Sequence, residues 1–216
     1  MSRGLIPPNM NDLSSFNVNV EGQPEVQWQP IYDYQTYANA GFTGETLFFQ
    51  VPAGQSAKTV EDTNMTAQGR LPTPVNMVIT ALEIYFSPGT VVSATGAIVA
   101  RNWNDVNAFY RGRMSFRFRI GEKDYAQEAP LNVLPQVFGL TGAAALSDTT
   151  SAAASRVTVI DYAVARGPVY QVVPMRLISN QQFFAAIQSP AVVALPSGVD
   201  ARFGVRAQGF RFRLAQ

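Results

Sequence analysis

Arginine alternates with large apolar residues in two short segments, and these guanidinium groups are the side chains whose type and spacing indicate a chemical role. The first segment runs from residue 111 to 120, and the second from residue 201 to 214. Because successive side chains on a strand point to opposite faces, such a strand has one arginine face and one apolar face. The predicted interface or polyanion-facing residues are Arg111, Arg113, Arg117, Arg119, Arg202, Arg206, Arg211 and Arg213.

Three kinds of partner fit these arginine faces. Guanidinium groups bind the carboxylates of a neighbouring subunit or the phosphates of a nucleic acid through paired hydrogen bonds. The phenylalanines of the same segments are expected on the opposite face, so they cannot stack on a nucleic acid that the arginines hold. The third interpretation is salt bridges to Asp or Glu on neighbouring strands. A net charge of +1 gives no overall attraction to polyanions and favours a subunit over a genome.

The composition excludes several kinds of catalytic chemistry. The sequence contains no cysteine and no histidine, which excludes disulfides, zinc sites built on these residues and histidine acid–base catalysis. Among the scattered acids Asp161 is the most interesting, but a role as counter-ion to an arginine explains it better. Glu61-Asp62-Thr63-Asn64 could form an all-oxygen calcium site or a plain polar loop. We therefore expect no enzyme, no catalytic residue, no cofactor and no bound metal.

The bulk composition predicts one large domain. The chain has 216 residues, of which 47% are hydrophobic and only 14% are charged, against a typical charged fraction of about 25%. This low charge indicates either a surface covered by other subunits or a neutral secreted or periplasmic β-protein, and both interpretations stay open. The N-terminus has no apolar signal region, and no apolar run is long enough for a membrane span.

Alternation of apolar and polar residues predicts an all-β fold. Residues 1–15 are expected to form an extended N-terminal arm that orders against a neighbour, and residues 16–216 a single domain. Residues 22–44 are expected to be an aromatic loop, 97–110 to hold a short helix, and 139–155 to be a surface loop or an alanine helix. Strands are predicted at 16–20, 45–51, 75–86, 111–120, 156–165, 169–178, 183–188 and 202–214. The run at 75–86 is either a central strand or a pair broken by a bulge near Thr80, and Pro174 indicates an edge or a bulge at 169–178.

These eight to nine strands do not alternate with helices, and at most one or two short helices are expected. A doubly wound fold is therefore disfavoured. The pattern predicts an antiparallel β-sandwich of jelly-roll type.

The C-terminal third resembles virion proteins of bacteriophages. The stretch PMRLISNQQFF at 174–184, LPSGV at 195–199 and the ending RAQGFRFR at 206–213 are similar to the tail of small virion proteins from phages and prophage-like elements. The run from Pro74 to Phe86, before a Pro-Gly turn, is similar to the same group. The resemblance implies a jelly-roll coat protein or another capsid-associated protein of a tailless, lipid-containing type of phage.

The sequence therefore predicts a virion structural protein, a capsid subunit that self-assembles through its β-domain. The alternative is a receptor- or carbohydrate-binding β-sandwich of a viral spike or fibre. Expected partners are other copies of the chain, in a trimer or larger capsomer, other virion proteins, and a weak contact with packaged genome or an internal membrane. The expected location is the virion, after synthesis in the host cytoplasm.

Overall fold

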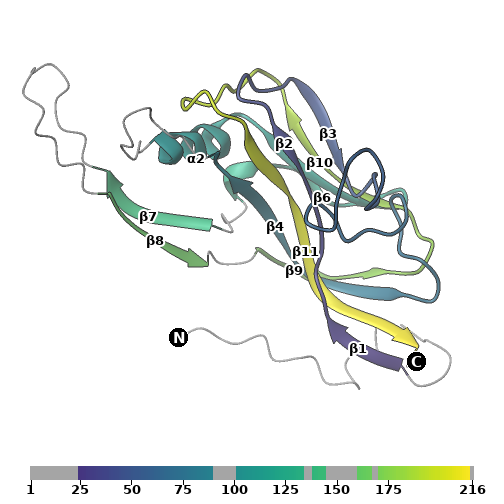
Figure 1. The fold of residues 1–216 in the computed structure, drawn as a ribbon. Helices are drawn as coiled ribbons and strands as arrows, with labels where there is room; N and C mark the ends of the chain where they lie inside the picture. Colours follow the sequence, from purple (N-terminus) through teal and green to yellow (C-terminus); the bar gives the residue numbers. More distant parts are fainter. Residues whose placement is uncertain (1–23, 90–100, 134–137, 145–159, 167–169, 215–216) are drawn as a thin grey trace, which may run out of the picture.

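Two antiparallel β-sheets lie face to face in the computed structural model, which describes residues 24–89, 101–133, 138–144, 160–166 and 170–214 (Figure 1). The first sheet contains β1 (Pro24–Trp28), β2 (Ile31–Tyr37), β4 (Asn76–Ser87), β9 (Tyr170–Leu177) and β11 (Ala201–Leu214). The second contains β3 (Gly44–Phe48), β5 (Ser115–Ile120), β6 (Lys123–Pro130) and β10 (Phe183–Ser189). The remaining elements are the helix α2 (Arg101–Arg111), the 3₁₀ turn η1 (Leu131–Val133), and the hairpin of β7 (Phe138–Ala144) and β8 (Ile160–Arg166), which projects from the sandwich.

The order of the strands is that of a jelly roll. β1 and β2 follow each other along the same edge of β11, so they occupy one position, and the β7–β8 hairpin stands apart from both sheets. In chain order, the first sheet then holds the first, eighth, third and sixth strands, and the second holds the second, seventh, fourth and fifth. Early strands therefore pair with late ones, as two Greek keys require. The predicted all-β sandwich of jelly-roll type is confirmed.

The prediction of a loop at residues 22–44 is wrong, because most of this segment forms β1 and β2. Both strands pair with β11 in one continuous register, from Pro24 opposite Leu214 to Tyr37 opposite Ala201. The break falls at Gln29 and Pro30, where the proline has no backbone N–H to donate. The alternation was hidden because β2 buries a charged residue, Asp33, on its inner face and carries tyrosines on its outer face.

The first arginine segment is only partly a strand. The expected strand at 111–120 begins at Ser115, because Arg111 is the last residue of α2 and the Gly112 N–H donates to the Ala108 carbonyl at 2.8 Å to close the helix. Arg113 lies in the turn that follows. The predicted short helix is confirmed as α2, and within β5 the alternation of buried phenylalanines with half-buried arginines is confirmed.

Three expectations about irregular positions can be tested. β4 is a central strand, and Thr80 is its extra residue, because Gln208 lies opposite Ala81 while Gly209 lies opposite Ile79. Pro174 lies in β9, at the edge of the first sheet, as expected. The expectation of a loop or alanine helix at 139–155 is wrong for residues 139–144, which belong to β7. The arm at 1–15, the strand at 16–20 and residues 145–159 lie outside the described residues.

The core lies between the sheets and is rich in aromatic rings. β11 contributes Phe203 and Val205, β4 contributes Ile84 and Phe86, and β5 contributes Phe118 among others. The helix α2 packs against one end of this core, and its Phe109 ring stacks on Phe86 at 4.3 Å between centroids. The Tyr110 hydroxyl on the same helix donates to the Ile84 carbonyl at 3.0 Å, and burial raises the pKa of Tyr110. Within the described residues no helix is long and apolar enough to cross a membrane.

Replacing Phe118 by alanine tests the alternation of β5. The ring is fully buried against Phe183, so its loss leaves a cavity and is expected to lower the free energy of unfolding by about 3–5 kcal/mol. The adjacent Arg119→Gln is the matched control, because exposed ion pairs contribute only about 0–1 kcal/mol. Urea unfolding of both variants gives the comparison, and equal losses would contradict the assignment of faces.

Candidate functional site

The two arginines of β5 form ion pairs within the chain. Arg117 reaches across β10 to Glu45, with 2.5 Å between Nη2 and Oε1, and its guanidinium lies 5.5 Å from the centroid of the Phe184 ring. Arg119 lies opposite Asp124 on β6 at 3.9 Å, and its guanidinium also donates to the Gly121 and Glu122 carbonyls. Both side chains remain about one third exposed or less. For Arg117 and Arg119, the interpretation as salt bridges to acids on neighbouring strands therefore holds within a single chain.

The arginines at the start of β11 belong to a lattice of polar and aromatic side chains on the outer face of the first sheet. Arg206 lies opposite Glu83, with 3.4 Å between their charged groups, and also donates to the Tyr34 hydroxyl at 2.9 Å. Arg202 pairs with Asp62 at 2.5 Å and lies over the Tyr34 ring at 5.1 Å. The rings of Tyr34 and Tyr85 meet at 4.6 Å between centroids.

Gly204 allows this lattice to form, because it lies between Tyr34 and Tyr85 on the neighbouring strands. A Cβ at this position would come within 2.5 Å of the Tyr34 ring and 2.2 Å of the Asp33 carbonyl. The sequence interpretation missed this stacking, because the aromatic partners of these arginines come from other strands.

The remaining arginines of β11 lie on the other face of the strand, so the expectation of one shared arginine face is wrong there. Arg211 and Arg213 have the same parity as the core residue Phe203, whereas Phe210 and Phe212 point outward into a second apolar cluster with Val26 and Val78. The polarity of β11 reverses at Gln208 and Gly209, beside the bulge at Thr80 of β4.

Arg213 binds a residue of β1, and Arg211 binds Gln29, the residue that follows β1. Arg213 pairs with Glu25 at 2.8 Å and thereby lowers the pKa of that carboxyl, and Arg211 donates to the Gln29 side chain at 2.8 Å. Burial lowers the pKa of Arg211, and the charge of Arg213 adds to this effect.

Arg111 and Arg113 differ from the other six predicted residues. Both are exposed, and in the described part of the chain neither forms an ion pair. They line a cavity of about 340 Å³ beneath the end of α2, together with Ser115 of β5, Pro130 and Asn132. No carboxylate is among the described residues that line this cavity. Two guanidinium groups without a described carboxylate partner lie at one opening, and their chemistry is that of an anion-binding group.

A buried carboxylate holds the long loop between β3 and β4 in place. Asp33 is fully buried on the inner face of β2, where Oδ1 pairs with the Lys58 ammonium and Oδ2 accepts the Phe49 N–H at 2.5 Å. Burial raises the pKa of Asp33, while Lys58 and the Phe49 N–H act in the opposite direction. Next to this pair, the loop covers the free edge of β2, because Tyr34 N–H donates to the Asp62 carbonyl at 2.8 Å.

The candidate calcium segment at 61–64 is part of this loop and its side chains do not converge on one point. The Asp62 carboxylate accepts hydrogen bonds from Thr59, which lower its pKa together with Arg202. The Asn64 side chain instead accepts the Tyr32 N–H and donates to the Pro30 carbonyl. In the described residues no three acidic side chains are grouped in a way that could hold a metal ion. Asp161 lies in β8, where its backbone pairs with Ala143.

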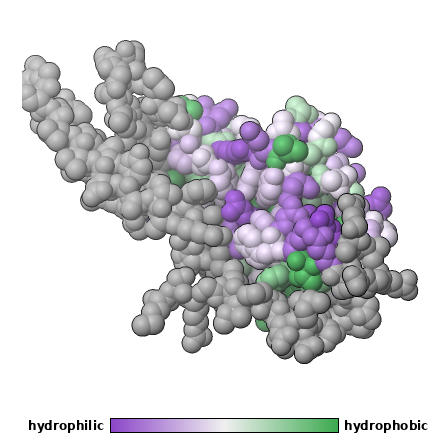
Figure 2. Space-filling view, turned by 60° about the horizontal axis from the view of Figure 1, so that its bottom comes forward, coloured by the Kyte–Doolittle hydropathy of each residue, from purple (hydrophilic) through white to green (hydrophobic). Residues whose placement is uncertain are grey.

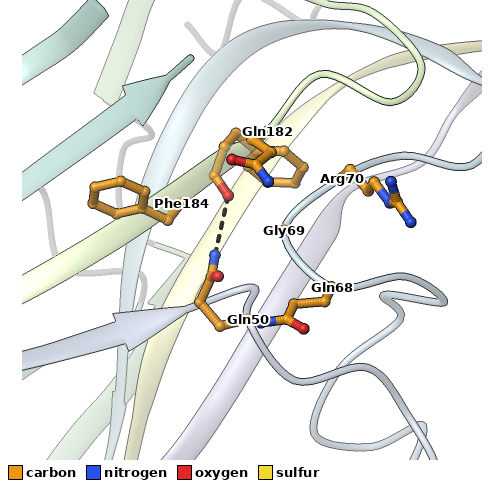
Figure 3. A pocket seen from close by; sticks show the side chains of 7 residues that line it. Gln50, Gln68, Gly69, Arg70, Gln182 and Phe184 are labelled. Carbon is orange, nitrogen blue, oxygen red and sulfur yellow. Dashed lines mark hydrogen bonds between the residues drawn. The ribbon is translucent and has the colours of Figure 1, made fainter. Parts of the chain in front are cut away.

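A second cavity, of about 330 Å³, lies where the loop meets the start of β10. Figure 3 shows Gln182 on one side, Gln50 and Gln68 on the other, and Arg70 and Phe184 towards opposite ends. Its floor is fixed by Gly69, whose N–H donates to the Phe49 carbonyl and whose carbonyl accepts the Phe183 N–H, both at 2.8 Å. None of these glutamines was singled out from the sequence, because isolated glutamines in a loop and at a strand end carry no periodic signal.

On the face that Figure 2 shows, the described residues present a mostly polar surface with no broad apolar area. Hydrophilic residues cover most of it, with small hydrophobic patches between them. The large exposed apolar side chains come from separate elements: Trp28, Leu47, Val60, Tyr125, Val173, Ile178 and Val192. Contacts with partners on this surface would therefore depend on charge and hydrogen bonds more than on apolar area.

Comparison of the chain with protein-family models, with curated proteins and with solved structures found no match.

Replacing Asp33 by asparagine tests the buried ion pair. Asparagine keeps an oxygen for the Phe49 N–H but leaves the Lys58 ammonium, only 12% exposed, without its counter-ion. Breaking such a pair on one side is expected to cost about 3 kcal/mol in the free energy of unfolding, measured by urea denaturation. The double variant Asp33→Asn/Lys58→Met should recover part of the loss. A single variant as stable as the parent would show that the pair does not hold the loop.

Proposed function

We propose that this protein is a virion structural protein, a capsid subunit that self-assembles through its jelly-roll domain. The observation that carries the proposal is the strand order of the two sheets, an architecture found in viral capsid proteins and also in lectins and cupins. The sequence lacks histidine and cysteine, the residues on which many metal-dependent enzymes build their sites. The resemblance of the C-terminal third to phage virion proteins supports the same proposal.

The charge distribution adds support. Six of the eight predicted arginines find partners within their own chain. The chain has few charged residues to begin with, and this internal pairing lowers the number of unpaired charges further. Arg111 and Arg113 are left for an external partner. We therefore place the subunit contact at the cavity beneath α2, with a carboxylate of a neighbouring copy or another virion protein as the partner that fits two guanidinium groups.

Light scattering and electron microscopy of the purified protein test this function. A capsid subunit is expected to form capsomers or larger particles as protein concentration and salt are varied. The alternative, a receptor-binding domain of a spike or fibre, would instead give one discrete small oligomer. A protein that stays monomeric under every condition tested would reject the coat function.

The double variant Arg111→Gln/Arg113→Gln tests the proposed contact. It should reduce particle yield strongly and leave the melting temperature within error of the parent, because exposed arginines without ion pairs contribute little to folding. The matched control is Arg117→Gln/Arg119→Gln, which changes the same number of charges but removes internal pairs. Equal particle yields for the parent and the Arg111/Arg113 variant would contradict this placement.

Deleting residues 1–15 tests the expected arm. The segment has few large apolar residues and two prolines, so we expect the shortened chain to keep its melting temperature and to assemble less well. Calorimetry and light scattering of the same preparation give both quantities. Unfolding of the shortened chain would assign the segment to the core instead.

A further inference from the structure

The cavity beside Gly69 is built on a strained and tightly fixed backbone. Phe49, a buried aromatic residue, has φ of 69° and thus adopts a left-handed conformation, which is rare for a side chain of this size. Its N–H is held by the buried Asp33 carboxylate, and its carbonyl accepts the Gly69 N–H. Strain of this kind, costing about 1–3 kcal/mol, is concentrated at functional sites.

The strain has a direct local consequence, because it ends β3 and sets the course of the chain at the next residue, Gln50. The Gln50 amide then donates to the Phe183 carbonyl at 3.2 Å across the cavity (Figure 3). Gly69 also has a positive φ, of 57°, and a Cβ there would lie 2.9 Å from the Gln50 amide nitrogen. A side chain at this position would therefore displace the Gln50 amide and strain the backbone.

The side chains around the floor are polar and largely unused. Gln68, Arg70 and Gln182 are exposed and, among the described residues, have no side-chain hydrogen bond or ion pair. After its bond to the Phe183 carbonyl, the Gln50 side chain still has its amide oxygen and one N–H available for a ligand. The cavity therefore presents several donors next to several acceptors, with one positive charge and no carboxylate in its lining.

We propose that this cavity is a carbohydrate-binding site. Sugar hydroxyls both donate and accept, so they can use the amide oxygens as well as the N–H groups of glutamines placed side by side, whereas a phosphate could use only the N–H groups. Phe184, half-buried at the end of the cavity opposite Arg70, offers the part of its ring that Arg117 does not cover as an apolar surface for the C–H groups of a sugar ring. The guanidinium of Arg70, with no acidic neighbour in the lining, selects a sugar that carries a carboxylate over a neutral one.

Saturation-transfer NMR on the full chain, with methyl β-glucoside and methyl β-glucuronide as probes, tests this site. We expect transfer to both sugars and tighter binding of the glucuronide. Gln182→Ala should weaken both by about tenfold, and Arg70→Ala should weaken the glucuronide by about tenfold and remove the preference. The matched control, Arg213→Ala, changes an arginine of β11 that lines neither cavity and should leave both affinities unchanged.

Absence of transfer to both sugars would overturn the proposal. Binding that persists in Gln182→Ala/Arg70→Ala, or that weakens equally in Arg213→Ala, would place any sugar elsewhere and overturn it as well. The site is independent of the proposed assembly, because sugar binding is measured on dissociated subunits and particle formation by light scattering. Protection of Gln68 and Gln182 from hydrogen exchange on assembly, without sugar binding, would assign the cavity to a subunit contact instead.

Discussion

The buried carboxylate of Asp33 is the interaction on which the loop and the second cavity both depend. An ionised carboxyl in the core would be costly without compensation, and here it is compensated by the Lys58 ammonium and the Phe49 N–H. Phe49 and Lys58 lie at opposite ends of the loop segment 49–58, so their contacts with one carboxylate hold both ends of that segment in place. The long connection between the sheets is thereby held against the edge of β2, and Phe49 stays in a conformation it would not adopt alone.

The second constraint is that β11 must serve two different environments along its length. Its first half lies in the sandwich, with Phe203 and Val205 facing the core and arginines facing outward. Beyond Gly209 it pairs with β1, and its outward side carries Phe210 and Phe212. The extra residue Thr80 shifts the alternation of β4 by one residue at the same level. Odd-numbered residues such as Ile79 face the core before Thr80, and even-numbered residues such as Leu82 face it afterwards.

The sequence predicted those parts of the fold that follow from strict alternation. β5 has strict period-two burial, and β10 and the first half of β11 follow it closely, whereas β4 is a long run that is buried on both faces. Apolar patterning was sufficient to find these strands and to predict a β-sandwich. β2 was missed because its inner face carries the charge of Asp33, whose partner Lys58 lies 25 residues away. The reversal of polarity in β11 is visible in its own sequence, because the arginines change from even positions (Arg202, Arg206) to odd ones (Arg211, Arg213), and it was missed because the arginines of the segment were assigned to one face.

The candidate sites were harder to predict for the same physical reason. Alternation identified which arginines share a face of one strand, but the partner of each arginine is set by register between strands. Arg213 meets Glu25 because β1 pairs with the end of β11, and Arg206 meets Glu83 because β4 pairs with its start. Where neither strand pairing nor a nearby loop supplies an acid, as at the turn holding Arg113, the charge stays available. The helix end at Gly112 thus leaves Arg111 and Arg113 off the strands, where register between strands brings them no described acid.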